Sequence, residues 1–151
     1  MTADMSNYDD PDVESKWFAE RREEVSKYLQ REGVRHGRIR MVPAWYLAPY
    51  VSVWAVESID NSGSIGWWAI SGDMPNDYVS AEEARDPREA VRAIASLWKE
   101  AAQYIARGER HPTFSIGSGD QDAELAPMLA SRADLLLEWV SDPEVWEEDE
   151  L

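Results

Sequence analysis

The stretch GWWAISGDMPNDYVSAEEARDPREAVRAIASLW, residues 66–98, combines the signals of a strand and of a long helix. Residues 67–70 are bulky or apolar at every position, which is typical of a strand that is central in its sheet or covered on both faces. The polar cluster DMPND at 73–77 contains a proline and predicts a turn. The apolar faces of this strand and this helix must be covered by other parts of the chain. The stretch therefore decides how the rest of the chain is organised.

A long helix is predicted to begin at Pro87, because Asp86 can cap it and proline suits a first helical position. Gly108 can end this helix in left-handed backbone. Apolar residues recur between these points at spacings of three and four, as one helical face requires. They are Val91, Ile94, Trp98, Ala101 and Ile105.

The segment 67–98, together with SRADLLLEWVSDPEVW at 131–146, resembles domain-of-unknown-function family 4826, a family of small bacterial proteins of about this length. ISGDMPND at 70–77 is the most specific part of the resemblance, which extends from the first helix to Trp146. The resemblance implies a single bacterial domain. It implies no activity, so no catalytic residue is carried over from the family.

Two more helices are predicted outside the central stretch. Asp10 and Pro11 provide a cap and a first position for a helix that Gly33 can end. Another helix is predicted over 124–140, and Asp142 begins a last short turn. The buried face of the first helix is predicted to contain Val13, Trp17, Val25, Tyr28 and Leu29.

Strands are predicted between the first two helices. Residues 51–57 alternate as a strand does, and IDNSGSIG at 59–66 predicts a hairpin that returns into 66–71. Residues 38–47 are expected to form a third strand, at the sheet edge or with a bulge at Pro43. Together, these patterns predict an α+β fold: a small antiparallel sheet of two or three strands packed against three main helices.

The length of 151 residues predicts a single domain over 1–151, with residues 1–9 and 147–151 expected to be disordered. The absence of cysteine excludes disulfides and thiolate metal sites. The first 15 residues are acidic and lack the pattern of a secretory signal, and no apolar run approaches the roughly 20 residues that a membrane span needs. We therefore expect a cytoplasmic protein.

The net charge of −15 is unevenly distributed along the chain. Residues 120–151 contain eleven acids and one base, whereas residues 16–40 contain eight bases and four acids. Nucleic-acid binding is disfavoured, because it needs a dense cationic face to neutralise phosphates. The charge instead favours plain solubility or a basic protein partner.

No assembled catalytic or metal-binding motif is present in the sequence. His36 and His111 have no motif around them, and GSGD at 117–120 lacks the length and the lysine of a phosphate-binding loop. Four acids could in principle meet a hard cation, but their spacing does not match a calcium-binding loop, and turn and cap roles explain them as well. They are Asp73, Asp77, Glu82 and Glu83. We predict no catalytic residue, no cofactor and no metal.

Tryptophan is abundant, with eight in the chain, and two of them are adjacent. Trp67 and Trp68 must point to opposite faces of their strand, so they cannot both enter one core layer. One of them must be covered by a different element, face a pocket or belong to an interface, where tryptophan is enriched.

Two functional hypotheses follow from the sequence. The first is a non-enzymatic protein-binding module, whose acidic and aromatic surface meets a basic protein partner or a second copy in a homodimer. The alternative is a small-molecule-binding domain or an enzyme. Its site would lie near Trp45, Trp68, Asp73, Asp77 and Tyr78.

Overall fold

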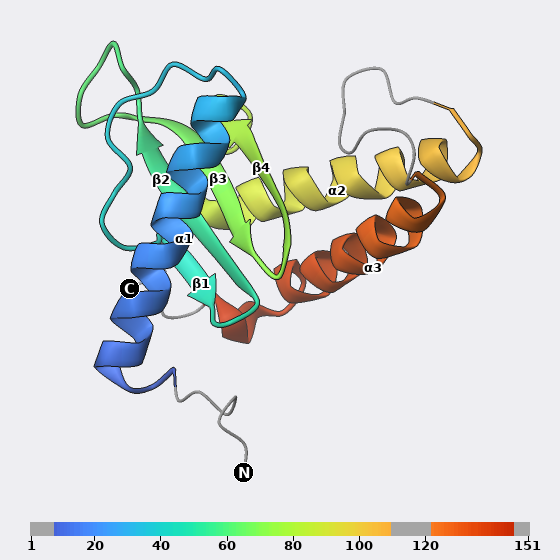
Figure 1. The fold of residues 1–151 in the computed structure, drawn as a ribbon, viewed down its shortest axis with the longest axis horizontal. Helices are drawn as coiled ribbons and strands as arrows, with labels where there is room; N and C mark the ends of the chain where they lie inside the picture. The colour runs from blue at the N-terminus through green and yellow to red at the C-terminus, as the bar shows by residue number, and fades with distance from the viewer. Residues whose placement is uncertain (1–7, 110–121, 147–151) are drawn as a thin grey trace. The chain divides into compact units, whose positions relative to one another are not determined.

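A computed structural model describes residues 8–109 and 122–146 of the chain. These residues form three α-helices, one four-stranded antiparallel sheet and a short 3-10 helix (Figure 1). They divide into two compact units, the first ending at Pro87 and the second beginning at Arg88. The predicted α+β class is therefore confirmed. Of the residues 1–9 and 147–151, for which disorder is predicted, 1–7 and 147–151 lie outside the described ranges. Tyr8 and Asp9 lie in a turn, and the ring centroid of Tyr8 is 6.1 Å from that of Trp17.

The sheet of the first unit has the strand order β1-β2-β3-β4, with every neighbouring pair antiparallel. The predicted hairpin between β2 and β3 is confirmed, and β2 has the predicted bounds. The strands are β1 (Trp45–Leu47), β2 (Val51–Glu57), β3 (Ile65–Gly72) and β4 (Met74–Ser80).

The fourth strand, β4, occupies the segment for which the sequence predicts a polar turn. The chain reverses at Gly72 instead, where φ is +156° and an added Cβ would lie 2.2 Å from the carbonyl oxygen of Tyr50. Only glycine fits so close an approach. Pro75 is tolerated inside β4 because this strand lies at the edge of the sheet. The sheet accordingly has four strands rather than two or three.

The predicted third strand over 38–47 is interrupted. Ile39 forms an isolated bridge with Val56, and pairing with β2 resumes only at β1. Pro43 lies in the break and, as expected for a proline, provides no N–H for the ladder. The prediction of an edge segment disturbed at Pro43 is confirmed.

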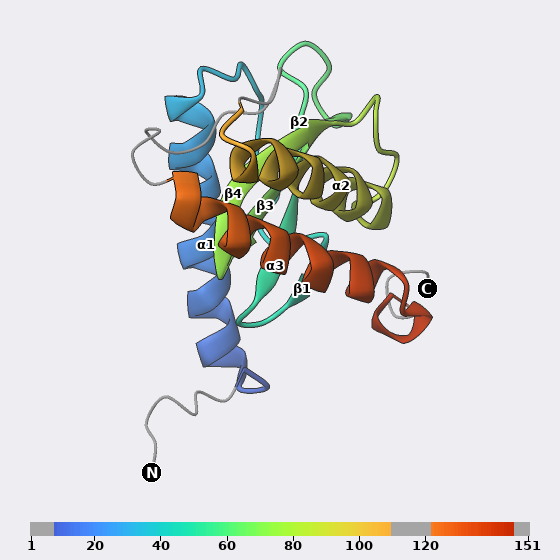
Figure 2. The same cartoon turned by 90° about the vertical axis from the view of Figure 1, so that its right-hand side faces the viewer.

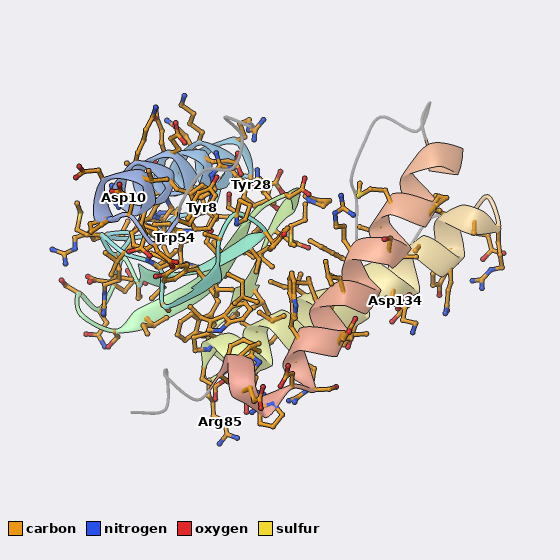
Figure 3. The ribbon with its side chains drawn as sticks, turned by 90° about the horizontal axis from the view of Figure 1, so that it is seen from below. Tyr8, Asp10, Tyr28, Trp54, Arg85 and Asp134 are labelled. Atoms are coloured by element: carbon orange, nitrogen blue, oxygen red, sulfur yellow. The ribbon has the colours of Figure 1, made fainter. Side chains whose placement is uncertain are left out.

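Helix α1 (Pro11–Arg31) covers one face of this sheet (Figure 1). Asp10 caps it, since its carboxylate accepts a hydrogen bond from the N–H of Asp12 at 2.9 Å, and Pro11 occupies the first position as predicted. Trp54 projects from β2 into the space under the helix (Figure 3). The buried core here consists of Val25, Leu29, Ile39, Trp54, Val56 and Ala69.

The two adjacent tryptophans of β3 point to opposite faces, as predicted. Trp67 is half-buried on the α1 side, where its ring centroid lies 5.7 Å from that of Tyr78. Trp68 is buried on the other face, and its indole N–H donates a hydrogen bond to the carbonyl of Ala84 at 2.8 Å. The segment that follows β4 therefore satisfies the polar atom of Trp68.

The second unit is a pair of antiparallel helices, α2 (Pro87–Ala106) and α3 (Asp122–Val140), followed by the 3-10 helix η1 (Pro143–Val145) (Figure 2). Lys99 of α2 and Asp134 of α3 form an ion pair at 3.3 Å. Four of the five residues predicted for the apolar face of α2 are buried, and Ile105 is partly buried.

Arg88 joins the start of α2 to the end of α3. Its Nε and Nη2 atoms donate hydrogen bonds to the carbonyl of Val140 at 3.0 and 2.8 Å. Its guanidinium also lies 5.8 Å from the ring centroid of Trp146, whose indole N–H donates to the carbonyl of Trp139 at 2.9 Å. A cation at the carboxyl end of a helix is also favoured by the helix dipole.

We expect Arg88→Ala to destabilise the protein by about 1.5–3 kcal/mol, because hydrogen bonds from a charged donor contribute about that much. The measurement is the free energy of unfolding from urea denaturation. Arg92→Ala is the matched control, since Arg92 lies one turn along α2 and is exposed. Equal losses in the two variants would show that the bonds to Val140 contribute nothing.

Candidate functional site

Two neighbouring apolar side chains project from the break in the edge of the sheet. Among the described residues, Met41 and Val42 are the most exposed large apolar side chains, at 66% and 58%. Tyr50 and Ile59 are also exposed, so all such residues of the described chain fall between 41 and 59. We name Arg38, Met41 and Val42 the edge surface, because the exposed Arg38 lies on the same edge segment.

Helix α1 holds one side of this segment through Arg22. The Nη2 of Arg22 donates to the carbonyl of Ile39 at 2.7 Å, and its Nε donates to the carbonyl of Arg40 at 3.1 Å. These contacts fix the two residues that directly precede Met41. They also occupy carbonyl groups at the sheet edge, which hinders the addition of another strand there.

Glu57 holds the same segment from the β2 side. Its Oε2 accepts from the Nε of Arg40 at 3.0 Å, and its Oε1 accepts from the N–H of Gly63 at 3.1 Å. The N–H of Gly63 is the main cause that lowers the pKa of Glu57 below its usual value. Arg40 and Arg38 add to this effect, and burial opposes it. The residues that directly precede Met41 are therefore held from two directions, by Arg22 of α1 and by Glu57 of β2.

We expect Glu57→Gln to lower the melting temperature at pH 7. The folded-state pKa of Glu57 lies below its unfolded value, so the ionised carboxylate stabilises the fold above the unfolded pKa. This contribution is lost as the pH falls through the folded-state pKa, so the wild type and the variant should converge in acid. Thermal melts across this pH range test it, with the exposed Glu82→Gln as control. A melting difference that does not change with pH would contradict the prediction.

The opposite edge of the sheet, β4, is also poorly suited to pairing with another strand. Pro75 has no N–H, and the Oδ1 of Asp77 accepts a hydrogen bond from the N–H of Tyr78 at 2.8 Å. Short strands, prolines and charged residues are common means of protecting sheet edges. Contacts made by this unit should therefore depend on side chains rather than on strand addition.

The five residues of the predicted small-molecule site do not share one face. Trp45 and Trp68 are buried on the side of the sheet opposite α1, and register places Asp77 beside Ile70 on that side. Asp73 is exposed between β3 and β4. The ring centroid of Tyr78, by contrast, lies 6.1 Å from that of Tyr28 on α1. A shared role for the five in binding stays a prediction.

Burial is the first cause that raises the pKa values of Tyr28 and Tyr78 above their usual range. The carboxylates of Asp77 and Glu32 raise both pKa values further. Both phenols accordingly remain protonated at neutral pH and can donate hydrogen bonds. No general base is available from either side chain.

Sequence reasoning missed the edge surface. Met41 fits the alternation of residues 38–41 and reads as an ordinary strand position. The available signal is Val42 followed by Pro43, because a residue before proline is pushed away from regular pairing and the proline breaks the ladder. An apolar residue next to such a break is a candidate for exposure.

Comparisons with known proteins give a family but no activity. Within 8–109 and 122–146, no group of three or more His, Cys, Asp and Glu side chains could hold a metal ion. None of the helices in this part of the chain has the length and apolar character of a membrane span. No curated protein and no solved structure matches the chain. A family model, described as a domain of unknown function, matches residues 12–146, and the chain therefore belongs to the DUF4826 family.

Proposed function

We propose that this protein is a non-enzymatic protein-binding module that contacts its partner through the edge surface. The observation that supports the proposal is the pair Met41 and Val42, adjacent in sequence and more than half exposed. Apolar residues exposed singly are ordinary, whereas neighbouring exposed apolar residues are candidates for an interaction site. Burial of apolar surface contributes about 25 cal/mol per Å².

The segment that precedes Met41 is already held in place in the free protein, which favours binding. Arg22 and Glu57 already hold the residues that precede Met41 in place. Less conformational entropy is then lost when a partner covers Met41 and Val42, and preorganisation of this kind improves affinity. The Nε of Arg38 lies 4.0 Å from the Oε2 of Glu57, but the side chain is 66% exposed and can also pair with a carboxylate or an aromatic ring of the partner.

The charge of the whole chain favours a basic partner. With a net charge of −15, two copies repel each other at long range, so a basic protein is a better candidate than a homodimer. The acids are concentrated in residues 120–151, and their field would steer a basic partner toward the protein. In this proposal, the acidic residues 120–151 steer the partner, and the edge surface makes the contact.

The double variant Met41→Ser, Val42→Ser should reduce partner capture from lysate of the native host on immobilised protein. Burying one such side chain contributes about 1.5–3 kcal/mol, so we expect affinity for an identified partner to fall at least about tenfold. Ile59→Ser is the matched control, because Ile59 is 49% exposed but lies in the β2–β3 connection. Unchanged capture by the double variant would refute a role for the edge surface.

Salt should slow association with the same partner. The Debye length falls from about 10 Å at 0.1 M salt to about 3 Å at 1 M, which screens the steering charges. The dissociation rate should change less, because the contact at Met41 and Val42 is apolar. Surface plasmon resonance at several salt concentrations separates the two rates. An association rate indifferent to salt, or capture of acidic partners alone, would contradict the electrostatic part.

A further inference from the structure

All the sulfur in this protein belongs to methionine side chains. The chain contains five methionines and no cysteine, so no thiol competes for an oxidant that reacts with sulfur. Three of the five, Met41, Met74 and Met128, lie in the part of the chain that the structure describes. Met41 is exposed, whereas Met74 and Met128 are partly buried. Of these three sulfur atoms, an oxidant in solution therefore reaches that of Met41 most easily.

The backbone of the edge segment explains the exposure of Met41. The N–H of Arg40 donates to the carbonyl of Ala55 at 3.1 Å, and the N–H of Ala44 donates to the carbonyl of Val53 at 2.8 Å. Three residues of the edge segment lie between these two bonds, whereas a single residue of β2 lies between them. The surplus residues have no place in the ladder and bulge away from it. Met41 belongs to this bulge, so its exposure is built into the pairing of the sheet.

A peroxide oxidises the thioether of an accessible methionine to a sulfoxide. With hydrogen peroxide, the sulfur lone pair attacks one peroxide oxygen, an S–O bond forms and the O–O bond breaks. The sulfur loses two electrons and the peroxide gains them. The second oxygen takes the proton of the first and leaves as water. The product is a polar side chain whose oxygen accepts hydrogen bonds, whereas the unmodified side chain is apolar.

We propose that Met41 is a modification site, at which a peroxide converts the edge surface from apolar to polar and weakens partner binding. The effect on binding rests on the proposed function, whereas the preferred oxidation of Met41 does not. Burying a polar group without a hydrogen-bond partner is unfavourable, so a protein that covers Met41 binds its sulfoxide more weakly. Methionine sulfoxide reductases restore the thioether, so the modification is reversible.

The first experiment treats the full chain with hydrogen peroxide and follows each methionine by peptide mass spectrometry. Met41 should form its sulfoxide at least about threefold faster than Met74 and Met128, because the surrounding protein shields the other two. Met1 and Met5 lie outside the described residues and are followed separately. If Met41 reacts no faster than Met74 and Met128, the proposal is overturned, whatever the edge surface binds.

The second experiment measures the affinity of the oxidised protein for a partner identified with the unmodified protein. Oxidation should weaken this affinity at least about fivefold, and treatment with a methionine sulfoxide reductase should restore it. Met41→Leu is the matched control, because it keeps an apolar side chain of similar size and leaves the other four methionines in place. Its affinity should stay unchanged in peroxide. An equal loss in this variant would assign the effect to another methionine and overturn the proposal.

The double variant Met41→Ser, Val42→Ser separates failure of this proposal from failure of the proposed function. If the double variant loses the partner while oxidation of Met41 leaves the affinity unchanged, the edge surface makes the contact and only the modification proposal is overturned. If the double variant keeps the partner, the proposed function is refuted, together with the effect of oxidation on binding. Thermal melts of the oxidised protein and of both variants verify that each is folded.

Discussion

The burial of Trp54 between α1 and the sheet is the contact on which the first unit depends. Its ring is fully buried, and Phe18 of α1 lies edge-on to it with ring centroids 6.5 Å apart. A buried indole N–H needs an acceptor, and Ser52 provides one from the same strand. Ser52 must then lie in the core, where its own hydroxyl bonds to the carbonyl of Ser71. One large side chain thus brings the first polar groups under the helix.

The two edges of the sheet are protected from strand addition by different groups. At both edges, few backbone groups are left open for pairing with another strand. At the edge near β1, Arg22 takes the carbonyls of Ile39 and Arg40, whereas at β4 a proline and an aspartate reduce the available N–H groups. These positions leave few open backbone groups for strand addition. Exposed side chains, above all Met41 and Val42, are therefore the contact points in the proposed function.

Periodic segments could be predicted from the sequence, and tertiary features could not. Helix α1 starts at Pro11 and β2 spans 51–57 as expected, because caps and alternation are local signals. Strand β4 was not predictable in this way, since Pro75 and its polar neighbours favour a turn, and only pairing with β3 makes them a strand. The hydrogen bond between Ser71 and Glu24 could not be predicted for the same reason, because the two residues are 47 apart in the sequence and meet only by packing. Trp45 and Trp68 suggested a site by residue type, yet both are buried.

The tie between Arg88 and Val140 has a consequence for how the chain tolerates change in length. It fastens the two helices of the second unit at the ends remote from the segment that connects them. The connection between Ala106 and Asp122 therefore does not have to hold the helices together. The entropic cost of closing a loop rises slowly with its length, by about 0.6 kcal/mol for each doubling. This connection is accordingly the place where the chain can accept an inserted peptide or a reporter domain while the helical pair keeps its alignment.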